Sequence, residues 1–407
     1  MVFYDLIHGY QPLIEKFIPD FVAKNLREIF LPTSSAMKKG LVRRGIQMQG
    51  WTVDTLLVVP RFKNIAKKIF QNLKIANQKK NIEVGISAYS HPILPMLSDD
   101  LIYSQIILDR EMVENNLGRA TWFWPPEGAV DQRVLKIIHQ AAPDLIILMP
   151  DKCLGRYNFS GPIKLKFSDS SCQKVLAFNC LLKDIFMNAG DYRVRPDYMQ
   201  YPNTLIWEKI KKIASQPKIL KAVLDEMGQS FYILMRDWEN AGSKTGLKKI
   251  GAAKEIAAFY KNKDLKFCLP SQIDWPKATI FPINKIIPAS WDMESTPADP
   301  YPWWLPNEKG KIWRTRSKNA KKMLKKWQAL ICEMDRLVSK KIKTRGGVKA
   351  ALKDEEFKIF LKKIFPGFHS CVAWHLFAKK DWHPDYGYSL KAMEKVVLPS
   401  IDKENLD

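Results

Sequence analysis

The feature of this 407-residue sequence that most restricts its fold is an alternation of short apolar runs with longer amphipathic segments. Buried strands are predicted at residues 2–7, 82–87, 120–124, 145–149, 175–178 and 231–235. Helices are predicted at residues 51–77, 101–117, 130–141, 205–227 and 248–260. Because short apolar strands separated by helices are typical of α/β proteins, we expect a parallel sheet whose faces are covered by helices.

The composition changes near Pro276, where a stretch rich in proline and tryptophan begins and runs to about Pro306. An apolar stripe at helical spacing follows, formed by Met323, Trp327, Leu330, Ile331, Met334, Leu337, Val338 and Ile342. We therefore predict a C-terminal helical subdomain that packs on the α/β part.

Positive charge is concentrated in this C-terminal part. The chain has a formal net charge of +23, and residues 311–364 alone contain 18 Lys and Arg against 5 Asp and Glu. A solvated basic helix face explains this excess, and a polyanion-binding face is the alternative. Since the aromatic residues fall on the apolar stripe and not among the lysines, we do not expect nucleic acid as a partner.

The remaining composition favours a soluble cytoplasmic protein. None of the six cysteines forms a Cys-x-x-Cys pair, so mostly reduced cysteines are expected. The N-terminal residues lack a basic segment followed by an apolar one, and the apolar runs are too short to cross a bilayer. We expect no membrane association, and the sequence leaves the oligomeric state open.

Polar residues directly follow several predicted strands. His8, Tyr89, His91, Glu127 and Asp237 all stand just after an apolar run. The carboxyl ends of parallel strands meet at one edge of the sheet, where α/β enzymes place their chemistry. The functional site is therefore expected at this edge.

Glu127 lies in the segment Trp124-Pro125-Pro126-Glu127-Gly128. The two prolines stiffen the backbone, and Gly128 allows a close approach of the chain. A carboxylate fixed in this way suits a positioned nucleophile. The alternative is a carboxylate that stabilises the N-terminus of the helix predicted to begin near Val130.

Asp237 and Glu239 follow the strand predicted at residues 231–235 and would belong to it if the strand continued. Strand alternation would place them on one side, and two neighbouring carboxylates can raise the pKa of one of them, as a general acid requires. A solvated loop after a strand is the alternative.

The sequence gives no support for a metal or an organic cofactor. His8, His91 and Asp237 could converge on a metal, but no His-x-His or His-x-x-x-His pair is present to anchor one. Dinucleotide-binding, Walker and Gly-x-Ser-x-Gly signatures are also absent from the sequence. We expect neither a metal nor another cofactor.

Taken in order, these segments resemble glycoside hydrolase family 57. Residues 8–12 (HGYQP) resemble its first motif, residues 85–95 (GISAYSHPILP) its second, residues 124–127 (WPPE) its third and residues 237–239 (DWE) its fourth. Residues 369–375 (HSCVAWH) are similar to a degenerate fifth motif. The resemblance implies an incomplete (β/α)7 catalytic barrel over residues 1–290. It also implies that residues 291–407, a Trp-rich loop and a basic C-terminal helical subdomain, complete the cleft.

The resemblance also implies a retaining glycoside hydrolase or transglycosylase, similar to 4-α-glucanotransferases, that acts on α-linked sugars of the α-glucan or α-galactoside class. It assigns Glu127 as the nucleophile and Asp237 as the acid/base. The predicted substrate-binding residues are His8, Gln11, Tyr89, His91, Trp124, Trp238, Glu239, Trp304 and Trp374. The expected partner is an oligo- or polysaccharide. Departures from the motifs, such as Gly9-Tyr10 before Gln11 and Arg236 before Asp237, leave the sugar open.

Three alternatives remain beside this interpretation. The first is a catalytically inactive carbohydrate-binding relative, although both Glu127 and Asp237 are present. The second is a polyanion-binding protein that uses the basic helices. The third is a polysaccharide deacetylase on a related barrel, which would require an Asp-Asp pair together with a His-x-x-x-His set, and the sequence has no His-x-x-x-His.

Overall fold

The structure is a computed structural model, and it describes residues 2–9, 19–155, 160–180, 231–238, 266–292, 295–302, 304–305 and 318–370. The helices predicted at residues 205–227 and 248–260 lie outside the described residues. So do three of the predicted substrate-binding residues, Gln11, Glu239 and Trp374.

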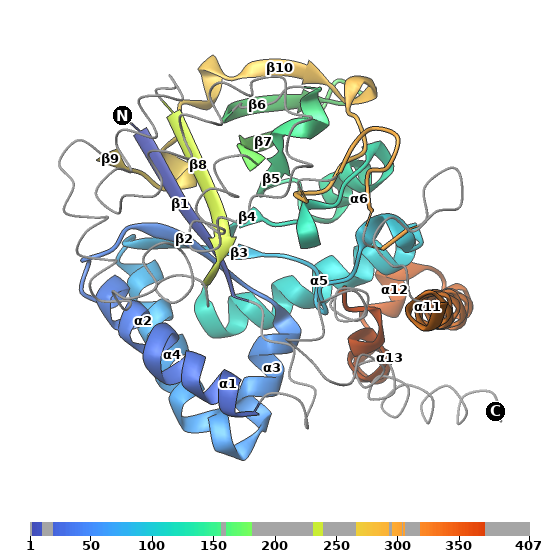
Figure 1. Cartoon of the computed structure of the whole chain (residues 1–407), viewed down its shortest axis with the longest axis horizontal. Helices are drawn as coiled ribbons and strands as arrows, with labels where there is room; N and C mark the ends of the chain where they lie inside the picture. The colour runs from blue at the N-terminus through green and yellow to red at the C-terminus, as the bar shows by residue number, and fades with distance from the viewer. Residues whose placement is uncertain are drawn as a thin grey trace.

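The described strands form one curled sheet (Figure 1). They are β1 (Val2–Gly9), β2 (Arg44–Met48), β3 (Ile82–Ile86), β4 (Ala120–Phe123), β5 (Ile146–Pro150), β6 (Gly161–Lys166), β7 (Cys172–Phe178), β8 (Phe231–Asp237), β9 (Lys266–Phe267) and β10 (Thr279–Pro282). Their order is β10-β6-β7-β5-β4-β3-β2-β1-β8, and β9 pairs with β1 off this path. Among the described strands, β8 comes close to β7 without pairing with it, so the sheet curls like a barrel that does not close.

Helices surround the outside of this sheet (Figure 1). The α-helices are α1 (Pro19–Asn25), α2 (Leu31–Lys38), α3 (Gly50–Val58), α4 (Pro60–Gln78), α5 (Asp99–Leu117), α6 (Gln132–Ala141), α11 (Lys318–Thr344), α12 (Val348–Ala351) and α13 (Glu355–Ile364). A π-helical turn (Leu26–Phe30) joins α1 to α2. The C-terminal helices lie together, and α11 and α12 pack against α5.

The structure corrects three details of the sequence prediction. The helix predicted at residues 51–77 is two helices, because Pro60 has no backbone N–H to donate and begins α4. The strands β2, β6, β9 and β10 were not predicted, and in β2 the Arg, Gly and Gln interrupt the apolar pattern. The sheet is also not wholly parallel: β6 and β7 form an antiparallel hairpin, closed by a tight turn in which Ser170 has a φ of 68°.

The inside of the curled sheet is packed with side chains. This interior cluster includes Tyr4, Leu6, Trp122, Trp124, Ile146, Leu148, Leu176, Phe178, Ile233, Met235, Trp275 and Trp291. Trp122 requires two glycines beside it: a Cβ on Gly85 would lie 2.4 Å from its indole ring, and one on Gly45 would lie 3.1 Å away. The missing side chains at these two positions make room for the indole.

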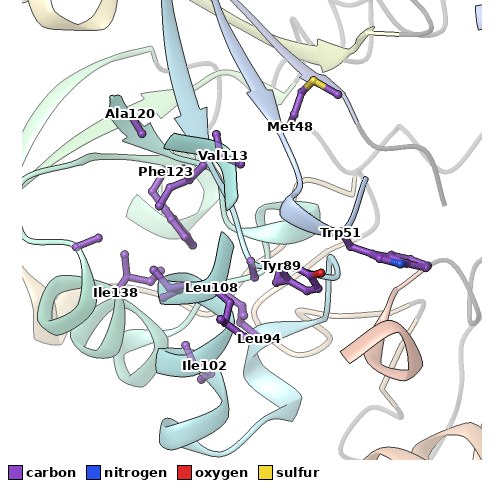
Figure 2. Close-up of a cluster of buried hydrophobic side chains, with 14 of the residues drawn as sticks. Met48, Trp51, Tyr89, Leu94, Ile102, Leu108, Val113, Ala120, Phe123 and Ile138 are labelled. Carbon is purple, nitrogen blue, oxygen red and sulfur yellow. The ribbon is translucent and has the colours of Figure 1, made fainter. Parts of the chain in front are cut away.

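A second core fills the space between the sheet and the surrounding helices (Figure 2). Phe123, Leu108, Ile102 and Ile138 lie in it, contributed by β4, α5 and α6.

No described helix is long and apolar enough to cross a membrane. The five cysteines within the described residues are free thiols.

The predicted apolar stripe of the C-terminal part is confirmed on α11. Its residues Trp327, Ile331, Met334 and Val338 are buried and belong to the same core as α5. The lysines of this helix fall mainly on the opposite side, where Lys321, Lys322, Lys325, Lys326, Lys340 and Lys343 are exposed. Asp335 accepts hydrogen bonds from the backbone N and the hydroxyl of Ser98, the residue before α5. These contacts attach the helical part to the barrel.

The buried pair Asp5–Arg44 joins β1 to β2 and gives a stability prediction. Their charged atoms are 2.6 Å apart, and their side chains are 0% and 2% exposed. We expect Asp5→Asn to lower the free energy of unfolding by about 3–5 kcal/mol, because Arg44 would lose the charged carboxylate that lies 2.6 Å away in the interior. Urea denaturation measures the change.

A matched control is Glu333→Gln on α11, whose partner Arg336 is 2.7 Å away on the surface. Exposed pairs contribute about 0–1 kcal/mol, so this variant should unfold almost as the parent does. Equal effects of the two substitutions would contradict the importance assigned to the buried pair.

Candidate active site

The carboxyl ends of the central parallel strands bring several predicted site residues to one edge of the sheet. In the register of the sheet, His8 of β1 pairs with Gln47 of β2 on one side and with Asp237 of β8 on the other. Glu127 follows β4, and His91 follows β3. Residues separated by more than two hundred positions therefore meet at one edge, as expected for parallel strands.

Glu127 has a constrained backbone. It lies in a 3-10 turn (Pro126–Gly128) with φ 56° and ψ 15°, in the left-handed region, and its side chain is 12% exposed. A residue other than glycine in this region costs about 1–3 kcal/mol, and such strain concentrates at functional sites. The alternative role at a helix N-terminus is filled by another residue, since Asp131 caps α6 by accepting a hydrogen bond from the backbone N of Val134.

The carboxylate of Glu127 is fixed at both oxygens. The indole Nε1 of Trp291 donates to Oε2 at 2.9 Å, and the hydroxyl of Ser370 donates to Oε1 at 2.9 Å. The backbone N of Trp291 also donates to the carbonyl oxygen of Glu127 at 2.9 Å. These contacts restrict the rotation of the carboxylate and leave it at the edge of the sheet.

Two stacked histidines lie beside this carboxylate. The ring centroids of His8 and His91 are 4.8 Å apart, and their planes differ by 24°. His8 Nδ1 is 2.5 Å from Gln47 Oε1. His91 Nδ1 is 2.9 Å from the Ser370 hydroxyl and 3.6 Å from Glu127 Oε1.

Burial keeps both imidazoles neutral at neutral pH. Desolvation lowers the pKa of His8 from 6.5 to about 4, against the opposing effect of its hydrogen bond to Gln47. Desolvation, together with the nearby rings of His8 and His369, lowers the pKa of His91 well below 6.5. The pair therefore offers hydrogen-bonding groups without a fixed positive charge.

Trp124 lies beside His8, and its side chain is fully buried among other aromatic rings. Its ring centroid lies 6.4 Å from that of His8, 5.5 Å from Phe178 and 5.0 Å from Trp291. Within the described part of the chain, neither its indole N–H nor the amide nitrogen of Gln47 has a hydrogen-bond partner, although both are buried. Buried donors without partners are costly, so a polar ligand with hydroxyl groups would suit them.

Three of the predicted substrate-binding residues are buried in packed surroundings. Trp238 stacks on Phe30 at 4.0 Å, and its indole N–H donates to Thr33. The Tyr89 hydroxyl donates to Asp54 at 2.9 Å. Trp304 donates to the carbonyl oxygen of Ser370 at 3.3 Å. These contacts fix the loops around the site, and none of the three rings is exposed.

Sequence reasoning did not single out Gln47, Trp291 or Ser370 as site residues. Gln47 lies on β2, which was not predicted, so its position at the edge could not be inferred. Trp291 was seen only as part of the Trp-rich stretch. Ser370 lies within the residues that resemble a fifth motif, and that position was the one available signal.

Among the described residues, no group of three or more His, Cys, Asp or Glu side chains is arranged to hold a metal ion. The arrangement that is present consists of a fixed carboxylate, neutral imidazoles, an amide and indole rings. Such a set binds hydroxyl groups and positions a nucleophile.

The sequence matches the model of Glycosyl hydrolase family 57 over residues 12–245, which is more than half of the chain. The chain belongs to glycosyl hydrolase family 57. The predicted family is therefore confirmed, and with it the prediction that the protein belongs to a class of glycoside-active enzymes. A comparison with curated protein sequences found no match.

Three solved structures share the fold. A GH57-type branching enzyme from Pyrococcus horikoshii is 14% identical, with a TM-score of 0.61, over 97% of this chain and 88% of that one. The α-amylase AmyC from Thermotoga maritima is 12% identical, with a TM-score of 0.61, over 98% and 93% of the two chains. A 4-α-glucanotransferase from Thermococcus litoralis is 14% identical, with a TM-score of 0.60, over 99% of this chain and 59% of that one. The predicted incomplete (β/α)7 barrel is confirmed by this likeness.

The buried histidines of this family 57 protein predict a loss of stability in acid. The folded pKa of His8, about 4, lies below the unfolded value of 6.5, so between these values the unfolded chain binds the additional proton. The contribution of neutral His8 to the free energy of unfolding is complete above pH 6.5 and is lost as the pH falls toward 4. Between pH 6.5 and 4, the free energy of unfolding should fall by about 3 kcal/mol less in His8→Asn than in the parent.

Urea denaturation of parent and variant at several pH values between 4 and 7.5 measures this difference. Asn keeps a hydrogen-bonding group beside Gln47 and cannot be protonated in this range. If the free energy of unfolding depends on pH in the same way in both proteins, His8 is not buried in the neutral form.

Proposed function

We propose that the protein is a retaining glycoside hydrolase or transglycosylase for α-linked sugars, with Glu127 as the nucleophile and Asp237 as the acid/base. The observation that carries this proposal is the carboxylate of Glu127, held at both oxygens by Trp291 and Ser370 in a member of a glycosyl hydrolase family. The backbone of Asp237 lies beside His8 at the same edge, which supports its assignment as the second carboxylate.

In the first step, an oxygen of Glu127 attacks the anomeric carbon as the bond from that carbon to the leaving oxygen breaks. Asp237 gives its proton to the leaving oxygen, and a glycosyl-enzyme ester forms. In the second step, the Asp237 carboxylate takes a proton from the acceptor, which attacks the anomeric carbon and releases Glu127. Retaining chemistry requires a separation of about 5–5.5 Å between the two carboxyl groups.

The neighbouring polar groups suit the hydroxyls of the bound sugar. His8 and His91 are neutral, and Gln47 is anchored by His8, so each can exchange hydrogen bonds with hydroxyls without introducing charge. Trp124 keeps its predicted role as an aromatic wall of the site, since its ring is buried with its centroid 6.4 Å from that of His8. Gln11, Glu239 and Trp374 keep their predicted roles in substrate binding.

An α-glucan is the substrate class that we propose, ahead of an α-galactoside. The solved relatives are named as a branching enzyme, an α-amylase and a 4-α-glucanotransferase. We retain a catalytic barrel over residues 1–290 and a cleft-completing helical part over residues 291–407 as part of this proposal, together with a cytoplasmic location.

Product analysis tests the substrate class. The protein is incubated with maltooligosaccharides, starch, glycogen and α-galactosides, and the products are separated by chain length and linkage. We expect α-glucan substrates to react with retention of the anomeric configuration. Shorter products alone would indicate hydrolysis, longer α-1,4 products transfer, and new α-1,6 linkages branching. Products of inverted configuration would contradict the mechanism.

Kinetics of two variants separate the roles of the carboxylates. With an aryl α-glycoside that has a good leaving group, Glu127→Gln should form almost no glycosyl-enzyme, because the nucleophile is gone. Asp237→Asn should still form it, since this leaving group needs little protonation, and then release it slowly. Loss of a proton-transfer group costs about 10²–10⁴-fold in rate. Burst kinetics and mass spectrometry of the intact protein measure the intermediate.

Azide supplies the control for this experiment. As an anionic nucleophile it needs no general base, so it should restore turnover of Asp237→Asn and give a glycosyl azide of retained configuration. It should not restore Glu127→Gln, whose amide still fills the site. Identical behaviour of both variants would show that the assigned division of roles is wrong.

A further inference from the structure

Ser370 connects the C-terminal helical part to the predicted catalytic carboxylate. It follows a 3-10 turn (Phe365–Phe368) at the end of α13 and is fully buried. Its backbone N donates to the carbonyl oxygen of His91 at 2.9 Å, and the adjacent His369 forms a β-bridge with Pro92. The chain at residue 370 is therefore fixed against the loop that follows β3.

The single proton of the Ser370 hydroxyl defines the direction of its hydrogen bonds. The hydroxyl lies 2.9 Å from Glu127 Oε1 and 2.9 Å from His91 Nδ1. An ionised carboxylate can only accept, so the hydroxyl donates to Glu127 and must accept from His91. Neutral His91 can donate there if its proton is on Nδ1, and its lowered pKa keeps it in the neutral form.

The opposite oxygen of Glu127 is held from a different part of the chain. Trp291 Nε1 donates to Oε2 at 2.9 Å, so two donors at residues 291 and 370 hold the carboxylate between them. A carboxylate bound at one oxygen can still rotate about its side-chain bond. Binding at both oxygens fixes the plane in which its lone pairs lie, and reaction rates depend steeply on such orientation.

We propose that Ser370 is a positioning residue for the nucleophile, through a hydrogen-bond chain that runs from His91 Nδ1–H to the Ser370 hydroxyl and on to Glu127. Ser370 transfers no proton in this scheme: it aligns the attacking carboxylate and stabilises its negative charge before the glycosyl bond forms. The inference rests on the proposed role of Glu127. It assigns to the helical part a direct contact with the reacting group, beyond covering the barrel.

Ser370→Ala tests this role with the full-length protein and the aryl α-glycoside described above. Without the hydroxyl, the carboxylate loses the donor that holds Oε1 and is oriented less precisely, so the rate of glycosyl-enzyme formation should fall by about 10- to 100-fold. KM should change little, because Ser370 is not placed against the sugar. The loss should persist with better leaving groups, since a poorly aligned nucleophile is not helped by easier departure.

Two further variants distinguish positioning from packing. Ser370→Thr keeps the hydroxyl and should recover much of the rate, whereas Ser370→Cys keeps the approximate volume but is a weak donor and should remain slow. Ser104→Ala is the matched control: Ser104 is equally buried, but its hydroxyl donates to the carbonyl oxygen of Asp100 within α5. This variant should keep the parent rate, and thermal melting of all four shows which ones are folded.

The outcomes separate the inference from the proposed function. If Glu127→Gln is inactive while Ser370→Ala and Ser370→Cys react at the parent rate, the positioning role is overturned and the mechanism stands. If Glu127→Gln itself forms the glycosyl-enzyme, the proposed function fails. Should Ser370→Ala fail to fold, Ser370→Cys decides the question: a folded Cys variant with the parent rate overturns the positioning role, and a slow one supports it.

Discussion

The structure depends on the parallel hydrogen bonding of the strands around β1. That pairing gives β1, β2 and β8 the same direction and a fixed register, so His8 is flanked by Gln47 and Asp237. A shift of one residue would send the side chains of a strand to the opposite face. The interior cluster resists such a shift, because Trp122 fits only where Gly45 and Gly85 leave room for it. Packing inside the barrel thus determines which polar residues meet at its edge.

Much of this arrangement could be predicted from the sequence because it depends on local pattern. Continuous apolar runs identified β1, β3, β4, β5, β7 and β8, and helical periodicity identified α5, α6 and the buried stripe of α11. Since parallel strands place their carboxyl ends together, the proximity of His8, His91 and Glu127 followed from chain order alone. The resemblance to family 57 then connected those residues with a mechanism.

The remaining features depend on contacts between distant residues. Nothing in the sequence around Ser370 shows that its hydroxyl reaches Glu127, 243 residues earlier in the chain. The strand β2 was missed because Arg44 looks unsuitable for a buried strand until its pairing with Asp5 is known. The roles of the tryptophans were also ambiguous in the sequence. Trp124 lies beside His8, whereas Trp238 stacks on Phe30 and donates a hydrogen bond to Thr33. A tryptophan beside a catalytic motif can serve either packing or binding.

The packed interior also limits how a polymer can approach the enzyme. Among the described residues, Trp122, Trp275, Leu148 and Ile233 fill the inside of the sheet together with Trp124. A long sugar chain cannot thread through this packed interior and would lie across the edge of the sheet that carries the site. In the proposed mechanism, the donor chain, the leaving fragment and the incoming acceptor would then meet at this edge. The competition between water and sugar would depend on the order in which these molecules exchange there.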